Sequence, residues 1–246
     1  MRYFFEIAYK GTNYHGWQKQ LNAVSVQGVL EKTFSVFFQD TITITGSGRT
    51  DSGVHCEQQF FHVDIEKEFD IEECLYRLNT FLPPDISILS IRKVKPEAHA
   101  RFDATERRYE YRISRVKNPF LTDTAYRFLK PLDLDEMNLA ASLLMEYKDF
   151  QCFSKIKTDA ATFNCNITRA EWVDNDLIIF YVSANRFLRG MVRAITGTLL
   201  DVGQGKTTVK DFEEIIRSKD RKKAGVSTPP QGLFLTHVDY PSNVFL

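Results

Sequence analysis

The order of strand-like and helix-like segments in the first hundred residues constrains the fold more than any other feature. Residues 2–9 carry a large apolar side chain at every second position, which is typical of a half-buried strand. Ser25 and Asp70 each precede apolar residues at helical spacing, as helix-capping residues do. We predict strands at residues 2–9, 41–45, 58–64 and 86–94, with helices beginning after Ser25 and Asp70 and the second ending before Pro83-Pro84.

The remainder of the chain repeats this theme loosely. We predict strands at 107–115, 167–173, 177–184 and 233–240, and helices at 135–147, 187–202 and 208–218. The segment order favours an α+β fold of two ferredoxin-like or RRM-like halves, with predominantly antiparallel sheets that form a central cleft. We place an N-terminal domain at residues 1–100 and a C-terminal domain at residues 101–246.

Composition limits the class of protein. The 246 residues include 32 Lys or Arg and 32 Asp or Glu, so any basic surface is local. The four cysteines, none in a C-x-x-C pair, suit a reducing compartment. No secretory signal is visible, and no apolar run approaches the roughly 20 residues that span a bilayer. We therefore expect a cytoplasmic protein that does not enter membranes.

The segment Gly48–His55 holds the first candidate for chemistry. Asp51 stands between an arginine and glycines on a polar turn, where a glycine-rich backbone lets another molecule come close. The carboxylate is either a turn former bonded to its own backbone or a nucleophile or general base. Asp51 with His55 also suggests a metal-dependent nuclease, but a third ligand of plausible spacing is missing, so we predict no metal.

Two arginine-rich segments are candidates for RNA binding. Residues 101–112 mix four arginines, among them Arg107 and Arg108, with three aromatics; such a strand can stack on bases and contact phosphates, or can simply be exposed. In the predicted helix 187–202, extended back to residue 185, three arginines share one face. These are Arg186, Arg189 and Arg193, and they face either phosphates, a buried carboxylate or solvent.

Several blocks of the sequence together resemble a known protein family. Gly48–His55 resembles the signature of the tRNA pseudouridine synthase A family, and the other blocks follow in the family's order over essentially the whole chain. They are Tyr14–Gln20, Ser25–Glu31, Arg101-Phe102, Arg107–Tyr109, Phe187–Arg193 with Gly197, Pro230–Leu235 and Tyr240-Pro241. Ser52 and Cys56 depart from the alanine that is usual in the family.

The resemblance implies roles for individual residues. The catalytic aspartate falls at Asp51, the base-stacking tyrosine at Tyr109, and the arginine that pairs with the catalytic carboxylate at Arg193. Arg49 matches an arginine implicated in displacing the target base. Arg107, Arg108, Arg186 and Arg189 are further candidates for RNA contact.

The implied activity is isomerisation of uridine to pseudouridine in tRNA, at positions 38–40 of the anticodon stem-loop, by a homodimer. The product is an isomer of the substrate, so the reaction requires no cofactor and no metal. The alternative is a non-catalytic RNA-binding relative that uses the same arginines and aromatics.

Overall fold

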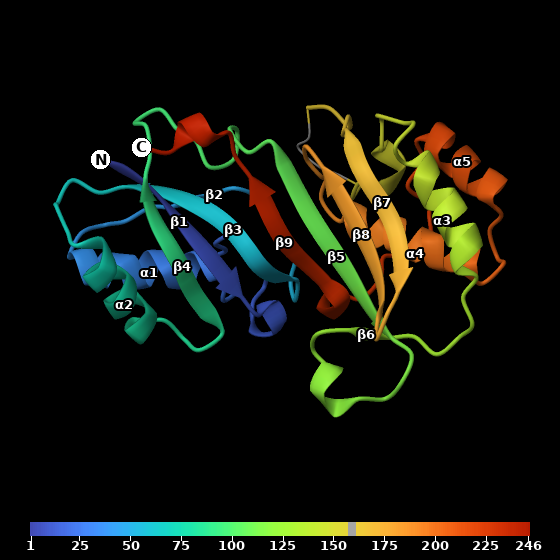
Figure 1. Ribbon diagram of the computed structural model, residues 1–246, viewed down its shortest axis with the longest axis horizontal. Helices are drawn as coiled ribbons and strands as arrows, with labels where there is room; N and C mark the ends of the chain where they lie inside the picture. Colours follow the sequence, from blue (N-terminus) through green and yellow to red (C-terminus); the bar gives the residue numbers. More distant parts are fainter. Residues whose placement is uncertain (157–160) are drawn as a thin grey trace. The chain divides into compact units, whose positions relative to one another are not determined.

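The computed structural model describes residues 1–156 and 161–246, which form two compact units (Figure 1). The first unit is Met1–Glu106 with Leu235–Leu246, and the second is Arg107–Phe234. The final twelve residues thus pack with the N-terminal unit. The domain division that we placed after residue 100 assigns them to the C-terminal domain instead. In the described residues, no helix is long and apolar enough to cross a membrane.

The first unit is a mainly antiparallel sheet with two helices. Its strands lie in the order β4 (Ile86–Lys93), β1 (Arg2–Tyr9), β3 (His55–Asp64) and β9 (Leu233–Asp239), and the short β2 (Thr45–Gly46) pairs with β3. The helices are α1 (Val26–Phe38) and α2 (Ile71–Phe81). Phe5 of β1 packs on Phe34 of α1 at a centroid distance of 5.0 Å. Its neighbour Phe4 points to the other face of the sheet, against Tyr240, so β1 is buried on both faces.

Capping residues begin the helices of the first unit as the sequence predicts. The Ser25 hydroxyl accepts a hydrogen bond from the Gly28 N–H (3.3 Å), and the Asp70 carboxylate accepts one from the Glu73 N–H (2.7 Å). Each bond satisfies one of the N–H groups that the first turn leaves without a partner.

The second unit combines an antiparallel sheet with three helices. Its strands lie in the order β5 (Glu106–Ser114), β8 (Ile178–Ala184) and β7 (Ile167–Asp174), and β6 (Tyr126–Arg127) runs parallel to β5. The helices are α3 (Leu134–Leu143), α4 (Met191–Gly203) and α5 (Val209–Ser218). Its short 3-10 helices are η2 (Pro119–Leu121), η3 (Gln151–Phe153) and η4 (Pro230–Gly232); the first unit contains η1 (Gly11–Asn13) and η5 (Ser242–Val244). The predicted α+β class with mostly antiparallel strands is confirmed.

The predicted strand at 41–45 is wrong over most of its length. Ile42 and Ile44 are buried as the alternation requires, but their N–H groups donate to side chains of α1 instead of to a strand. The acceptors are the Ser35 hydroxyl (2.9 Å) and the Glu31 carboxylate (3.4 Å). Alternating burial therefore arises here from packing beside a helix, and only Thr45–Gly46 pair with β3.

The predicted helix 187–202 is wrong at its start. Gly190 has φ +71°, a left-handed conformation that a continuous helix cannot contain, and α4 begins at Met191. Arg186 and Arg189 consequently precede the helix and do not share its face with Arg193.

Candidate active site and RNA-contact residues

In the first unit, Asp51 lies in the aspartate loop (Ser47–Val54) between β2 and β3, where it is half-buried. Two hydrogen bonds fix the backbone on either side of it. The Trp17 N–H donates to the Thr50 carbonyl (3.2 Å), and the Gly53 N–H donates to the Tyr14 carbonyl (3.2 Å). The segment Tyr14–Trp17, which we call the platform, therefore determines where Asp51 sits.

Further bonds reinforce this arrangement. The Ser52 hydroxyl donates to the Tyr14 carbonyl (3.3 Å), and the buried hydroxyls of Thr50 and Tyr9 are 2.8 Å apart. Ser52, a departure from the family pattern, thus adds a contact to the platform. On the platform's other side the Tyr14 hydroxyl donates to Asp85, and burial together with this carboxylate raises the pKa of Tyr14.

A glycine permits the close approach of platform and loop. Gly16 has φ +84°, and a Cβ there would lie 2.4 Å from the Thr50 carbonyl oxygen. Any side chain would separate the two segments or distort them, so glycine is required by both conformation and space.

The possible metal pair does not form a metal site. His55 is only 2% exposed, and its Nδ1 accepts a hydrogen bond from the Gly11 N–H (3.0 Å). This bond gives the imidazole a structural role at the start of β3. Among the residues that the structure describes, no group of three or more His, Cys, Asp or Glu side chains could hold a metal ion.

Arg49 lies in the same loop, two residues before Asp51, and is exposed.

In the second unit, Tyr109 lies on β5 opposite Val182 of β8. Its ring meets the ring of Phe187 edge-on, at a centroid distance of 5.1 Å and an interplanar angle of 86°. Edge-to-face contacts of this kind hold a ring without covering its whole face. Phe187 belongs to the segment that precedes α4, so this segment positions Tyr109.

Arg193 is the third residue of α4 and is half-buried in a helix whose other side chains are almost all buried. Its Nε donates to the Thr228 carbonyl (2.6 Å), while the Thr228 N–H donates to the Arg193 carbonyl (3.1 Å). This reciprocal pair fixes the direction of the guanidinium group. Thr228 is a positioning residue that the sequence patterns did not reveal.

The segment around Thr228 also reaches β5. The Tyr111 hydroxyl donates to the Pro229 carbonyl (2.7 Å). Burial raises the pKa of Tyr111, while the hydroxyl of Thr228 and the positive charge of Arg193 oppose that rise. A Cβ on Gly197 would lie 1.8 Å from the Val226 carbonyl oxygen, so this glycine allows residues 226–228 to lie against α4.

The other predicted arginines occupy different places. A guanidinium nitrogen of Arg107 donates to the Asn185 carbonyl (2.7 Å), so Arg107 and Tyr109 both contact the segment before α4. Arg108 is exposed and lies on the face of β5 opposite to that of Arg107 and Tyr109. Arg186 is half-buried and Arg189 exposed, both ahead of α4. Asp51 belongs to the first unit and Arg193 to the second. Their expected pairing, which depends on how the two units are placed, stays a prediction.

Comparison with known proteins places these features in a family. The family model described as tRNA pseudouridine synthase matches residues 7–103 and 140–241. The chain is 49% identical to the tRNA pseudouridine synthase A of Bacteroides thetaiotaomicron over 99% of this chain and 92% of that protein. It is 49% identical to the protein of the same name from Bacteroides fragilis (99% and 98% covered) and 45% identical to that from Porphyromonas gingivalis (100% and 99% covered). Similarity of this extent assigns the chain to the tRNA pseudouridine synthase family.

Proposed function

We propose that this chain is an isomerase that converts uridine to pseudouridine in tRNA, with Asp51 as its catalytic residue. The observation that carries the proposal is the fixed position of Asp51, because Thr50 before it and Gly53 after it are both hydrogen-bonded to the platform. Catalysis depends on holding a reacting group in place before the substrate arrives. Family membership favours the enzyme over a non-catalytic RNA-binding relative.

The reaction breaks the N1–C1′ bond, rotates the uracil and forms a C5–C1′ bond, after which C5 loses its proton to solvent and N1 takes one up. Atoms and electrons balance within the substrate, so the step consumes no oxidant, reductant or nucleotide. Asp51 acts either as a nucleophile or as a base that removes a sugar proton. Both roles require its ionised form, which a nearby positive charge stabilises.

Three other residues complete the proposed machinery. Tyr109 stacks on the uracil. The edge-to-face contact with Phe187 holds the Tyr109 ring in place without covering its whole face. Arg193, its direction fixed by Thr228, pairs with the catalytic carboxylate. Arg49, exposed two residues before Asp51, assists displacement of the target base. Extruding the base costs a few kcal/mol, and contacts between arginines and phosphates offset that cost.

The finer assignment of substrate is also a proposal. We infer that the enzyme acts in the cytoplasm as a homodimer on the anticodon arm, at positions 38–40. With no net formal charge, the chain must gather its basic residues locally to bind this arm.

The test is release of tritium from tRNA transcripts labelled at C5 of uridine, in buffer with EDTA. We expect release from a transcript with uridine at positions 38–40 and none from a matched transcript with cytidine there. Release from neither transcript would refute the activity. Equal release from both would refute only the assignment to positions 38–40.

A further inference from the structure

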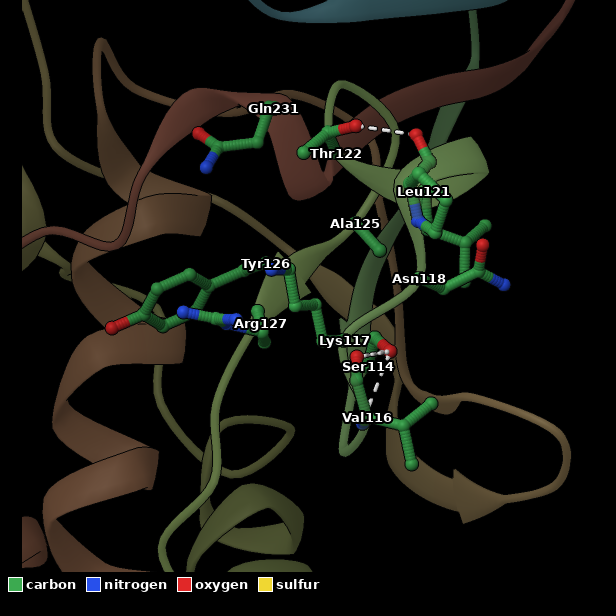
Figure 2. A pocket seen from close by; sticks show the side chains of 11 residues that line it. Ser114, Val116, Lys117, Asn118, Leu121, Thr122, Ala125, Tyr126, Arg127 and Gln231 are labelled. Atoms are coloured by element: carbon green, nitrogen blue, oxygen red, sulfur yellow. Dashed lines mark hydrogen bonds between the residues drawn. The ribbon is translucent and has the colours of Figure 1, made fainter.

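A hollow in the second unit is not used by the proposed mechanism. It has a volume of about 500 Å³ and lies between the end of β5, the β5–β6 loop (Arg115–Ala125) and η4. Figure 2 shows Tyr126, Arg127 and Gln231 on one side of it and the loop from Asn118 to Thr122 on the other. Cavities that bind small ligands enclose roughly 300–1,000 Å³, so the hollow can accept a group the size of a nucleotide.

The charge of the lining favours an anion. The lining residues include Lys117 and Arg127 and no Asp or Glu. Throughout the described part of the chain, neither cation has an ion-pair partner within 4.0 Å. Arg115, in the same loop but outside the lining, is instead paired with Asp174 at 3.2 Å. The two cations of the hollow therefore keep their charge available for a ligand.

The loop that forms one wall is shaped by its own hydrogen bonds. The Ser114 hydroxyl donates to the Val116 carbonyl (2.8 Å), and the Asn118 side-chain oxygen accepts from the Phe120 N–H (2.9 Å). The Thr122 hydroxyl donates to the Pro119 carbonyl (2.6 Å). These bonds, two of which appear in Figure 2, hold the wall in place before any ligand binds.

The hollow adjoins the residues proposed to handle the uridine. Gln231 in its lining is three residues after Thr228, whose carbonyl holds Arg193. The ring of Tyr126, also in the lining, lies 6.5 Å from the ring of Tyr111, which is two residues after Tyr109 on the same face of β5. A polynucleotide whose base lies on Tyr109 can therefore reach the hollow with a nucleotide a short way along the strand.

We propose that the hollow is a second RNA site that binds one nucleotide of the tRNA strand a short way from the target uridine. Lys117 and Arg127 bind its phosphate, and the amides of Asn118 and Gln231 face its base. Cations that contact phosphates and amides that contact base edges are the usual means of binding unpaired nucleotides. This inference rests on the proposed function, because it assigns a further contact with the same substrate.

The experiment compares Lys117→Ala/Arg127→Ala with wild type in tritium release from tRNA and in tRNA binding at several salt concentrations. We expect KM to rise about tenfold with kcat within twofold, since the contact holds substrate away from the reacting atoms. The plot of log binding constant against log salt should become shallower by about 0.7, for the one phosphate contact that is lost. Arg115→Ala is the matched control and should behave as wild type.

The outcomes separate the two proposals. No turnover by the wild type would overturn the proposed function. Turnover by the wild type, with the same KM and salt slope in the double variant, would overturn the nucleotide site alone. An equal loss in Arg115→Ala would reveal a general charge effect and would also overturn it. Altered sedimentation of the double variant with unchanged tRNA binding would assign the loop to contact between copies and would likewise refute the site.

Discussion

Replacing Gly16 by alanine should lower catalysis without touching any residue that meets the substrate. The new Cβ would lie 2.4 Å from the Thr50 carbonyl oxygen, whereas ordinary contacts begin at 3.4 Å. Platform and loop must therefore separate by about 1 Å at the residue next to Asp51. A displacement of that size can reduce turnover about 100-fold, so we expect kcat to fall by about this factor.

The same substitution also costs stability. A left-handed conformation costs an alanine roughly 1–2 kcal/mol, and loss of the hydrogen bond from Trp17 to Thr50 costs about 1 kcal/mol. The sum of about 2–3 kcal/mol lowers Tm by roughly 5–10 °C in a chain of this size. Thermal unfolding measured beside tritium release separates the two effects, since kcat is measured well below Tm.

Gly205→Ala is the matched control. Gly205 also has a positive φ (+69°), but nothing lies within 4 Å of a Cβ there. The control should lose stability through backbone strain and keep the wild-type kcat. A Gly16→Ala enzyme with unchanged kcat, or a Gly205→Ala enzyme with an equal loss of kcat, would refute the role of the platform.

Three further predictions follow from single side chains. We propose that the Tyr109 hydroxyl relays the proton that C5 loses. Tyr109→Phe keeps the ring against Phe187, so KM should hold while kcat falls, and an equal kcat would refute the relay. Arg189→Ala should weaken tRNA binding and reduce its salt slope by about 1, and unchanged binding would make Arg189 an ordinary solvated residue. Burial, aided by the charges of Arg2 and His99, lowers the pKa of His62 from 6.5 to about 4, so the free energy of unfolding should fall as pH falls from 6.5 towards 4. In His62→Asn, the amide oxygen can replace the ring nitrogen that accepts from the Ala100 N–H. The free energy of unfolding of this variant, measured with denaturant, should fall less than that of the wild type between pH 6.5 and 4. An identical fall would show that His62 is not the group responsible.

The sequence predicted those elements that local chemistry specifies. Ser25 and Asp70 cap helices in the structure because their side chains need only reach N–H groups three residues away. The strand at residues 2–9 was predictable from its apolar alternation, but its second face, with Phe4, is buried as well, which the alternation did not indicate.

Elements that depend on distant partners were not predictable. Residues 41–44 alternate like a strand, yet the N–H groups of Ile42 and Ile44 bond to side chains of α1, a contact that no local pattern contains. The start of α4 was missed because Gly190 adopts a left-handed conformation inside an apolar periodic run.

The candidate site divides in the same way. Asp51 was predicted from the arginine and glycines around it. The segment that contains the platform, Tyr14–Gln20, was noted as a motif, but its role in positioning Asp51 was not predicted. Thr228 was not revealed by the sequence, because it holds Arg193 mainly through its backbone carbonyl and N–H, to which its hydroxyl adds a hydrogen bond of 3.3 Å to the Arg193 carbonyl. Residues that act through their carbonyl or N–H leave no signal in a single sequence.

The central claim is that Asp51 carries the chemistry while the rest of the site binds and positions RNA. Its most direct test is tritium release from C5-labelled tRNA by Asp51→Ala beside wild type, with tRNA binding measured on both proteins. We predict that the variant releases no tritium and binds tRNA within a few-fold of wild type. Substantial release by Asp51→Ala would remove the aspartate from both the nucleophile and the base role, and would contradict the account.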